Sequence, residues 1–279
     1  MNKFIRLLLA MAVTGCLFTS GGCTAVSAVG AVGSTITNAA YNEAERRNRP
    51  SYVSPEQRRQ DIADANLRLG VAYMQNGQLD KALEKLERAR MAKKDHPQVY
   101  NAFGLLYRQM GQDDVAEKHF LTALNLDPDN SSVINNYGLL LCQNDRFDEA
   151  EEKFMKAAEN PLYQTPEIAL TNAGTCAMEN HETAKAETFF QMALRHNVNI
   201  APALIQMSEI SFDKGDYYSA RKYLERFIEI NDHTPKSLWL GVQIEQELGN
   251  RDSASSYALL LRNKFPDTEE AAELVQSGI

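Results

Sequence analysis

The side chains of this sequence that could do chemistry are its histidines, carboxylates and cysteines, and their spacing does not point to catalysis. None of the five histidines pairs with another at metal-ligand spacing on one helix face, and no Cys-x-x-Cys or His-Glu-x-x-His motif occurs. The Gly-x-Ser-x-Gly turn that presents a serine nucleophile is also missing from the sequence. We therefore expect a protein that is not an enzyme and that binds no cofactor and no metal.

Two of the four cysteines lie in an N-terminal segment that is typical of an export signal. Lys3 and Arg6 precede a mostly apolar run at residues 7–18, which is shorter than the roughly 20 apolar residues of a membrane span. Small residues before Cys23, and also before Cys16, resemble the lipobox in which a cysteine becomes the acylated N-terminus. We favour Cys23, because apolar residues continue beyond Cys16, and we keep Cys16 as the alternative.

This segment predicts export followed by attachment to a membrane through a lipid. Residues 1–22 are expected to be a lipoprotein signal peptide, and residues 23–60 a lipid-anchored flexible tether. The residue after Cys23 is Thr24 and not aspartate, which implies transport to the outer membrane with the folded part facing the periplasm. A soluble periplasmic protein with a conventional signal is the alternative.

Beyond residue 60 the sequence repeats itself, and the repeats are the elements that must position any site. Gly70, Gly104 and Gly138 are each 34 residues apart, Gly174 follows after 36, and Ser208 takes the same place 34 residues later. A small residue comes twelve positions after each of these, and a large apolar residue four positions further on. The small residues are Ala82, Ala116, Ala150, Ala186 and Ala220. We expect the glycines to let two helices cross closely, the alanines to receive them, and the large residues to fill the space between repeats.

This pattern resembles the tetratricopeptide repeat, and the resemblance covers roughly residues 61 to 266. It implies an all-α, right-handed solenoid of about six helix-turn-helix repeats. We expect a repeat domain at residues 61–266 and a C-terminal tail at 267–279. The six repeats are expected at residues 63–96, 97–130, 131–164, 167–200, 201–234 and 235–268, of which the last is degenerate.

In a tetratricopeptide repeat the first helix, helix A, lines a concave groove with its second, fifth, ninth and twelfth positions. We expect an extended peptide of a partner to bind there through backbone hydrogen bonds and apolar contacts. The alternative is that the asparagines only satisfy helix ends and neighbouring repeats. Capture of a chain terminus is not expected, because Arg108 is the only well-placed cation. The predicted groove residues are Asn101, Leu105, Arg108, Asn135, Leu139, Thr171 and Thr175.

The other two cysteines, Cys142 and Cys176, fall on the A helices of repeats three and four. Neighbouring A helices run alongside each other, so a disulfide can form if the two side chains face one another. An exported protein reaches a compartment in which such bridges persist. A bridge is our prediction, and two small buried thiols are the alternative.

Three local strings narrow the resemblance to one family. They are NNYG at residues 135–138, TNAG at residues 171–174, and ARKY at residues 220–223 together with WLG at residues 239–241. With the export signal and six repeats, the chain resembles the type IV pilus biogenesis lipoproteins of the PilF/PilW family, the pilotins. The resemblance implies an outer-membrane lipoprotein that assists multimerisation and localisation of the secretin ring through which the pilus passes.

The charge of the chain helps to define its partners. The formal net charge is −8 at pH 7, which disfavours binding to nucleic acid. We expect a protein partner, in first place the pilus secretin, no small-molecule substrate, and membrane contact through an N-terminal lipid. The alternative function is a tetratricopeptide scaffold lipoprotein for outer-membrane protein assembly or cell-wall synthesis.

Overall fold

The computed structural model describes residues 53–277, which contain 13 α-helices and no strand. This confirms the all-α fold of tandem helical repeats that the 34-residue period predicts. The predicted signal peptide at residues 1–22, both candidate acylation sites, Cys16 and Cys23, and most of the predicted tether at 23–60 lie outside the described residues. No helix in the described range is both long and apolar enough to cross a membrane.

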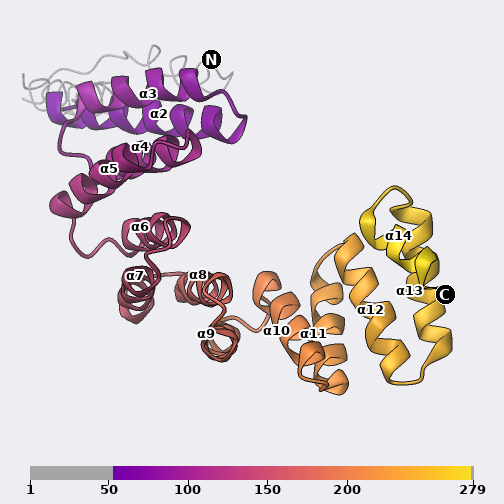
Figure 1. Cartoon of the computed structure of the whole chain (residues 1–279). Helices are drawn as coiled ribbons and strands as arrows, with labels where there is room; N and C mark the ends of the chain where they lie inside the picture. Colours follow the sequence, from indigo (N-terminus) through magenta and orange to yellow (C-terminus); the bar gives the residue numbers. More distant parts are fainter. Residues whose placement is uncertain (1–52, 278–279) are drawn as a thin grey trace, which may run out of the picture. The chain divides into compact units, whose positions relative to one another are not determined.

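Twelve of the helices form six consecutive pairs, each an A helix, a three-residue turn and a B helix (Figure 1). The A helices are α2 (Pro55–Gln75), α4 (Pro97–Gln109), α6 (Ser131–Gln143), α8 (Pro166–Glu179), α10 (Ala201–Asp213) and α12 (Pro235–Glu247). The B helices are α3 (Leu79–Ala92), α5 (Asp113–Leu126), α7 (Phe147–Glu159), α9 (Thr183–His196), α11 (Tyr217–Ile230) and α13 (Arg251–Lys264).

The middle residue of each three-residue turn adopts a left-handed backbone conformation. In four repeats this residue is a glycine with open space around its Cβ position, so backbone conformation and not crowding explains the residue type. Repeats three and four place Asp145 (φ 58°) and His181 (φ 59°) there instead. Aspartate and histidine are among the non-glycine residues that tolerate this conformation best. The turn geometry is therefore the same in all six repeats.

The repeat glycines allow close contact between the two helices of one repeat. A Cβ atom at Gly104 would lie 2.6 Å from the Phe120 ring, and one at Gly174 would lie 2.6 Å from the Phe190 ring. The large residue sixteen positions after the glycine thus covers it within the same repeat. The same relation holds for Gly70 with Leu86 and for Gly138 with Phe154, and the five predicted alanines are fully buried nearby on the B helices. The Phe120 ring also lies 6.3 Å from the Tyr137 ring of the next repeat, in line with the predicted packing between repeats.

The fifth repeat makes the same crossing with a serine. Ser208 is fully buried, and its Oγ atom donates a hydrogen bond of 2.8 Å to the carbonyl oxygen of Ala220 on α11. This bond satisfies a hydroxyl that would otherwise be costly to bury. The large residue of this repeat is Leu224 in place of a phenylalanine.

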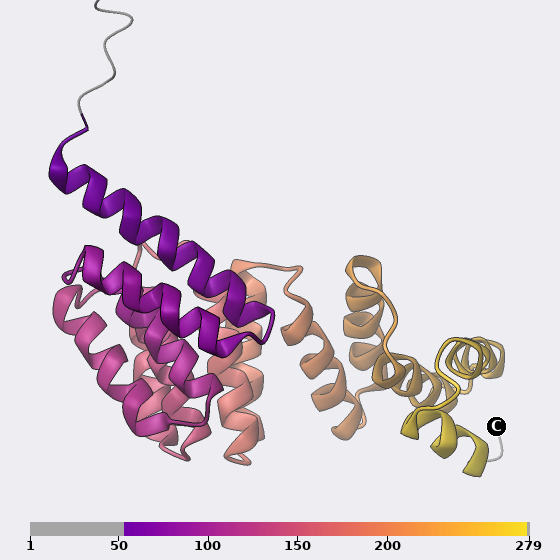
Figure 2. The same cartoon turned by 90° about the horizontal axis from the view of Figure 1, so that it is seen from above.

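Both ends of the repeat domain differ from the predicted boundaries. The long helix α2 begins at Pro55, so residues 55–60, which we assigned to the tether, belong to the first A helix (Figure 2). The predicted tail contains α14 (Glu269–Gln276), whose buried Ala271 and Leu274 pack against Leu238 and Leu261 of the sixth repeat. The last repeat of a solenoid has no successor to cover its apolar side, and α14 supplies this cover.

Candidate functional site

Three of the predicted groove residues line one hollow between consecutive A helices. Arg108 of α4, Leu139 of α6 and Thr175 of α8 belong to a hollow of about 410 Å³. Its other lining residues are Cys142, Gln143, Asp145, Asn172, Cys176 and Glu179. The predicted inward-facing positions of the A helices therefore identified this surface. They did not include four of its lining residues, Gln143, Asp145, Asn172 and Glu179.

Two asparagine pairs tie successive A helices together instead of facing a partner. Asn136 Nδ2 donates to Asn101 Oδ1 at 3.0 Å, and Asn172 Nδ2 donates to Asn135 Oδ1 at 2.9 Å. Asn135 is also only 5% exposed. The buried Asn135 is therefore used between repeats and does not present hydrogen bonds to a peptide as predicted. Asn101 is half-buried, and its role toward a peptide stays a prediction.

The remaining predicted groove residues differ in accessibility. Thr171 is 5% exposed, and its hydroxyl donates to the Glu167 carbonyl at 2.7 Å, so it is not available to a partner. Thr175 is exposed, and its hydroxyl donates to the Thr171 carbonyl at 3.1 Å, which leaves the hydroxyl oxygen free to accept. Leu105 is half-buried and packs against the apolar core of the repeats. Only Thr175 of these three can contact a ligand in the hollow.

A disulfide joins Cys142 on α6 to Cys176 on α8, with the two Cα atoms 5.9 Å apart. Both cysteines are almost fully buried, and both belong to the lining of the hollow. Glu179 Oε2 lies 3.2 Å from Cys142 Sγ, a contact that is not a hydrogen bond because a disulfide sulfur carries no proton. Since the bridge joins neighbouring repeats, it restricts the rotation between them that sets the curvature of a solenoid groove.

Arg108 supplies the positive charge of the hollow. Burial lowers the pKa of its guanidinium, and attraction to Asp113 opposes this shift, but an arginine remains protonated at neutral pH. Among the described residues, no hydrogen bond or ion pair engages the Arg108 side chain. Its N–H donors are therefore available to a ligand.

Two acidic residues also line the hollow. Asp145 belongs to the turn after α6, and Glu179 is the last residue of α8. Within residues 53–277, no group of three or more His, Cys, Asp or Glu side chains is arranged to hold a metal ion. The hollow thus offers one cation, two anions, an aliphatic side chain and a disulfide, which suits binding rather than catalysis.

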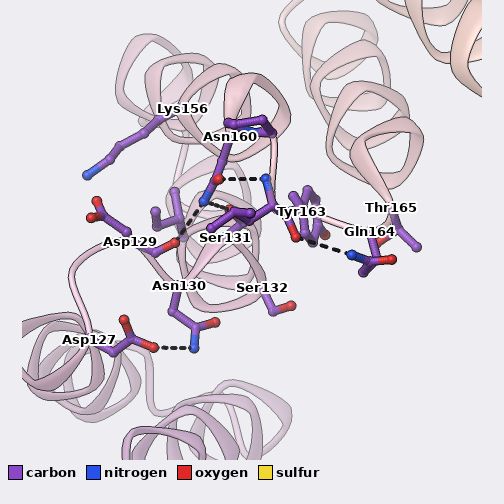
Figure 3. Close-up of a pocket in the computed structure, with 13 residues that line it drawn as sticks. Asp127, Asp129, Asn130, Ser131, Ser132, Lys156, Asn160, Tyr163, Gln164 and Thr165 are labelled. Carbon is purple, nitrogen blue, oxygen red and sulfur yellow. Dashed lines mark hydrogen bonds between the residues drawn. The ribbon is translucent and has the colours of Figure 1, made fainter.

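A second, larger hollow of about 650 Å³ lies at the loops that join repeats two to four (Figure 3). Residues 160–165 connect α7 to α8 and are two residues longer than the connection 127–130 between α5 and α6. Asn160 holds this loop, because its Nδ2 donates to the Asp129 carbonyl at 3.0 Å and to Ser131 Oγ at 2.8 Å. The sequence signal for this hollow is the 36-residue step from Gly138 to Gly174, two residues longer than the other steps between repeat glycines.

Comparison with known protein families agrees with this architecture. Models of the tetratricopeptide repeat match residues 61–129, 119–152 and 201–234. These segments are tetratricopeptide repeats, which confirms the resemblance drawn from the spacing of the glycines and alanines.

Individual relatives add a biological context. The chain is 27% identical over 118 residues to the type IV pilus assembly protein PilF of Pseudomonas aeruginosa, a match that covers 42% of this chain and 47% of that protein, about half its length.

The solved structure of Pseudomonas aeruginosa PilF has a TM-score of 0.70 at 26% identity, covering 78% of this chain and 99% of that one. The crystal structure of PilW, a type IV pilus biogenesis factor, has a TM-score of 0.67 at 26% identity, covering 77% of this chain and 98% of that one. These likenesses support a tetratricopeptide-repeat protein of type IV pilus biogenesis.

Proposed function

We propose that this tetratricopeptide-repeat protein is a pilotin of type IV pilus biogenesis, an outer-membrane lipoprotein that binds the pilus secretin and assists its multimerisation and localisation. The observation that carries the proposal is the structural likeness to PilF and PilW over 78% and 77% of the chain.

The hollow on α4, α6 and α8 is the surface that we assign to the secretin. Leu139 and the Cys142–Cys176 bridge offer apolar contact, and Gln143 and Thr175 offer hydrogen bonds to a peptide backbone. An extended segment of a partner needs both kinds of contact, because its side chains are apolar or charged while its backbone carries polar groups at every residue.

The disulfide prepares this surface for binding. A segment that binds between two repeats must otherwise fix their relative rotation at the moment of association, which costs conformational entropy. Because the bridge holds α6 and α8 together beforehand, part of this ordering precedes binding.

We assign the membrane anchor to Cys23. This assignment is supported by the small residues before Cys23 and the loose, small-residue segment after it. Replacing Cys23 with serine should leave unprocessed precursor, abolish palmitate labelling and remove the protein from the outer-membrane fraction. If Cys16→Ser does this and Cys23→Ser does not, the acylated residue is Cys16.

The secretin role is tested by a pair of substitutions in the hollow. Leu139→Gln with Thr175→Lys removes the apolar contact and places a long charged side chain at the exposed hydroxyl position. The matched control is Leu121→Gln with Thr188→Lys, two exposed B-helix residues outside the hollow, where Thr188 makes the same hydrogen bond to its own helix. Both variants should retain the helical circular dichroism spectrum and melt close to the wild type.

Secretin multimers, resolved by gel electrophoresis of membranes, and twitching motility are the measurements. We expect multimers and twitching to fall strongly in the hollow variant and to remain in the control. Normal multimers in a stably folded hollow variant would mean that the secretin binds elsewhere on the repeats. Normal multimers in a strain that lacks the gene altogether would remove the pilotin role.

A further inference from the structure

The hollow lined by Arg108, Leu139 and Glu179 carries opposite charges on its two sides. Arg108 lies on α4, whereas Glu179 lies at the end of α8 and Asp145 lies in the turn after α6. Leu139 lies on α6, the helix that packs between α4 and α8, and the disulfide joins α6 to α8. A ligand that crosses from α4 to α8 therefore meets the cation of Arg108, then Leu139 with Asp145 near the end of the same helix, and then the carboxylate of Glu179.

Arg108 differs from the other arginines that lie between repeats. Arg146 pairs with Glu117 at 2.8 Å, and Arg221 pairs with Glu245 at 2.6 Å, so each of these guanidinium groups already has a carboxylate across a repeat boundary. Arg108 is half-buried and has no such pair among the described residues, although Asp113 of the same repeat attracts it beyond ion-pair distance. A partly desolvated guanidinium with free donors is suited to bind a planar carboxylate through two parallel hydrogen bonds.

We propose that this hollow binds an internal acidic side chain, aspartate or glutamate, of an extended partner segment, and that Arg108 is the residue that pairs with it. The inference rests on the proposed function in one respect, namely that the occupant is a segment of a protein. Asp145 and Glu179 favour a basic side chain close to this acid on the same segment, and they disfavour a second acid by repulsion.

The same charges argue against a free chain terminus as the occupant. A terminal carboxylate would pair with Arg108 but would leave Asp145 and Glu179 without a cation and close to a new negative charge. An internal acid followed by lysine or arginine matches both signs. The occupant is therefore an acid–base sequence within a chain, with an aliphatic residue that contacts Leu139.

A random dodecapeptide display library, in which both peptide ends are blocked by fusion, tests this proposal on the purified full-length protein in detergent. Wild-type protein should enrich peptides with aspartate or glutamate near lysine or arginine and an aliphatic residue. Arg108→Glu should exchange the enriched acid for a base, and Arg108→Gln should remove the enrichment without reversing it. Arg195→Gln, at an exposed arginine of α9 outside the hollow, should leave the wild-type pattern unchanged.

A peptide selected on the wild type should bind Arg108→Gln roughly tenfold or more weakly in fluorescence anisotropy, as expected for a lost charge-assisted pair. Circular dichroism melting of each variant shows whether it is folded, and Arg108→Gln is the milder change if Arg108→Glu does not fold. The proposal is overturned if folded Arg108→Gln enriches the same peptides as the wild type, or if the wild type enriches no peptide. The secretin takes no part in this selection. A failed selection would therefore contradict the peptide proposal without contradicting the pilotin role.

Discussion

At the scale of single residues, the glycine of each A helix and the large side chain sixteen positions later behave as one unit. Glycine meets a phenylalanine ring at Gly104, Gly138 and Gly174, whereas Ser208 is combined with the smaller Leu224. The pairing suggests that a larger residue in helix A is tolerated when the facing residue in helix B is smaller. The exchange of volume is not strict, because Gly70 of the first repeat also faces a leucine, Leu86.

This pairing predicts the stability of a double variant. Gly104→Ser places a side chain where the Phe120 ring lies 2.6 Å from the Cβ position, and overpacking of this kind costs about 1–3 kcal/mol of unfolding free energy. Combining it with Phe120→Leu reproduces the fifth repeat, so the double variant should lose less than the sum of the two single variants. Urea unfolding of all four proteins measures this coupling. Strictly additive losses would contradict the pairing.

A second residue-scale prediction concerns Tyr137, which is 5% exposed and donates a hydrogen bond of 2.5 Å to Glu117 Oε1. Burial and this hydrogen bond raise the pKa of Tyr137 to about 12. An unfolded tyrosine ionises near pH 10. The neutral phenol therefore contributes its full stabilisation below pH 10, and this contribution is lost as the pH rises from 10 through about 12.

The difference in absorbance at 295 nm between wild type and Tyr137→Phe reports this ionisation. We expect a midpoint near pH 12 in the wild type, and a lower one in Glu117→Gln that still exceeds 10, because burial remains. A midpoint near pH 10 in folded protein would show that Tyr137 is not held by Glu117 in a buried environment.

At the scale of elements, the disulfide between α6 and α8 should affect these two helices more than the rest of the chain. It closes a loop with a sequence separation of 34, for which the chain-entropy model gives a stabilisation of roughly 3–4 kcal/mol, often less in practice. Cys142→Ser with Cys176→Ser should keep the helical spectrum but unfold at lower urea concentration.

Amide hydrogen exchange locates this effect. Reduction should speed exchange in α6 and α8 and leave α12, which lies at the other end of the repeats, close to its oxidised rate. Equal exchange in all helices before and after reduction, with an unchanged urea midpoint, would mean that the bridge does not constrain the two repeats.

The elements also show why the sequence predicted the fold better than the site. The helix pairs follow from a period of about 34 residues, because the glycine, the turn and the alanine of a repeat each have a local steric reason. Asn135 has no such local signature, since only its distance to Asn172 on the next A helix shows that its oxygen is already used. Likewise, α14 is a single short helix outside the repeats, so the repeat period could not predict it.

At the scale of the whole molecule, residues 55–277 form the repeat scaffold that carries the charged and partly apolar hollow of α4, α6 and α8. Asparagine pairs join successive A helices, a disulfide joins two of them, and α14 covers the last repeat. The polar side chains that the sequence assigns to partner binding therefore fall into two groups. Some bond within the repeats, and others remain accessible on the surface. Arg108, Leu139 and Thr175 remain as the surface that a partner can contact.

The central claim is that the secretin binds at this surface, and site-specific photo-crosslinking in living cells tests it most directly. A benzoylphenylalanine at Thr175 should form a crosslink to the secretin upon irradiation, detected by a secretin antibody, because this exposed residue lines the hollow. The same group at Thr188, an exposed residue on the B helix α9, should give none. A secretin crosslink from Thr188 but not from Thr175, or from neither in cells that assemble pili, would contradict the account.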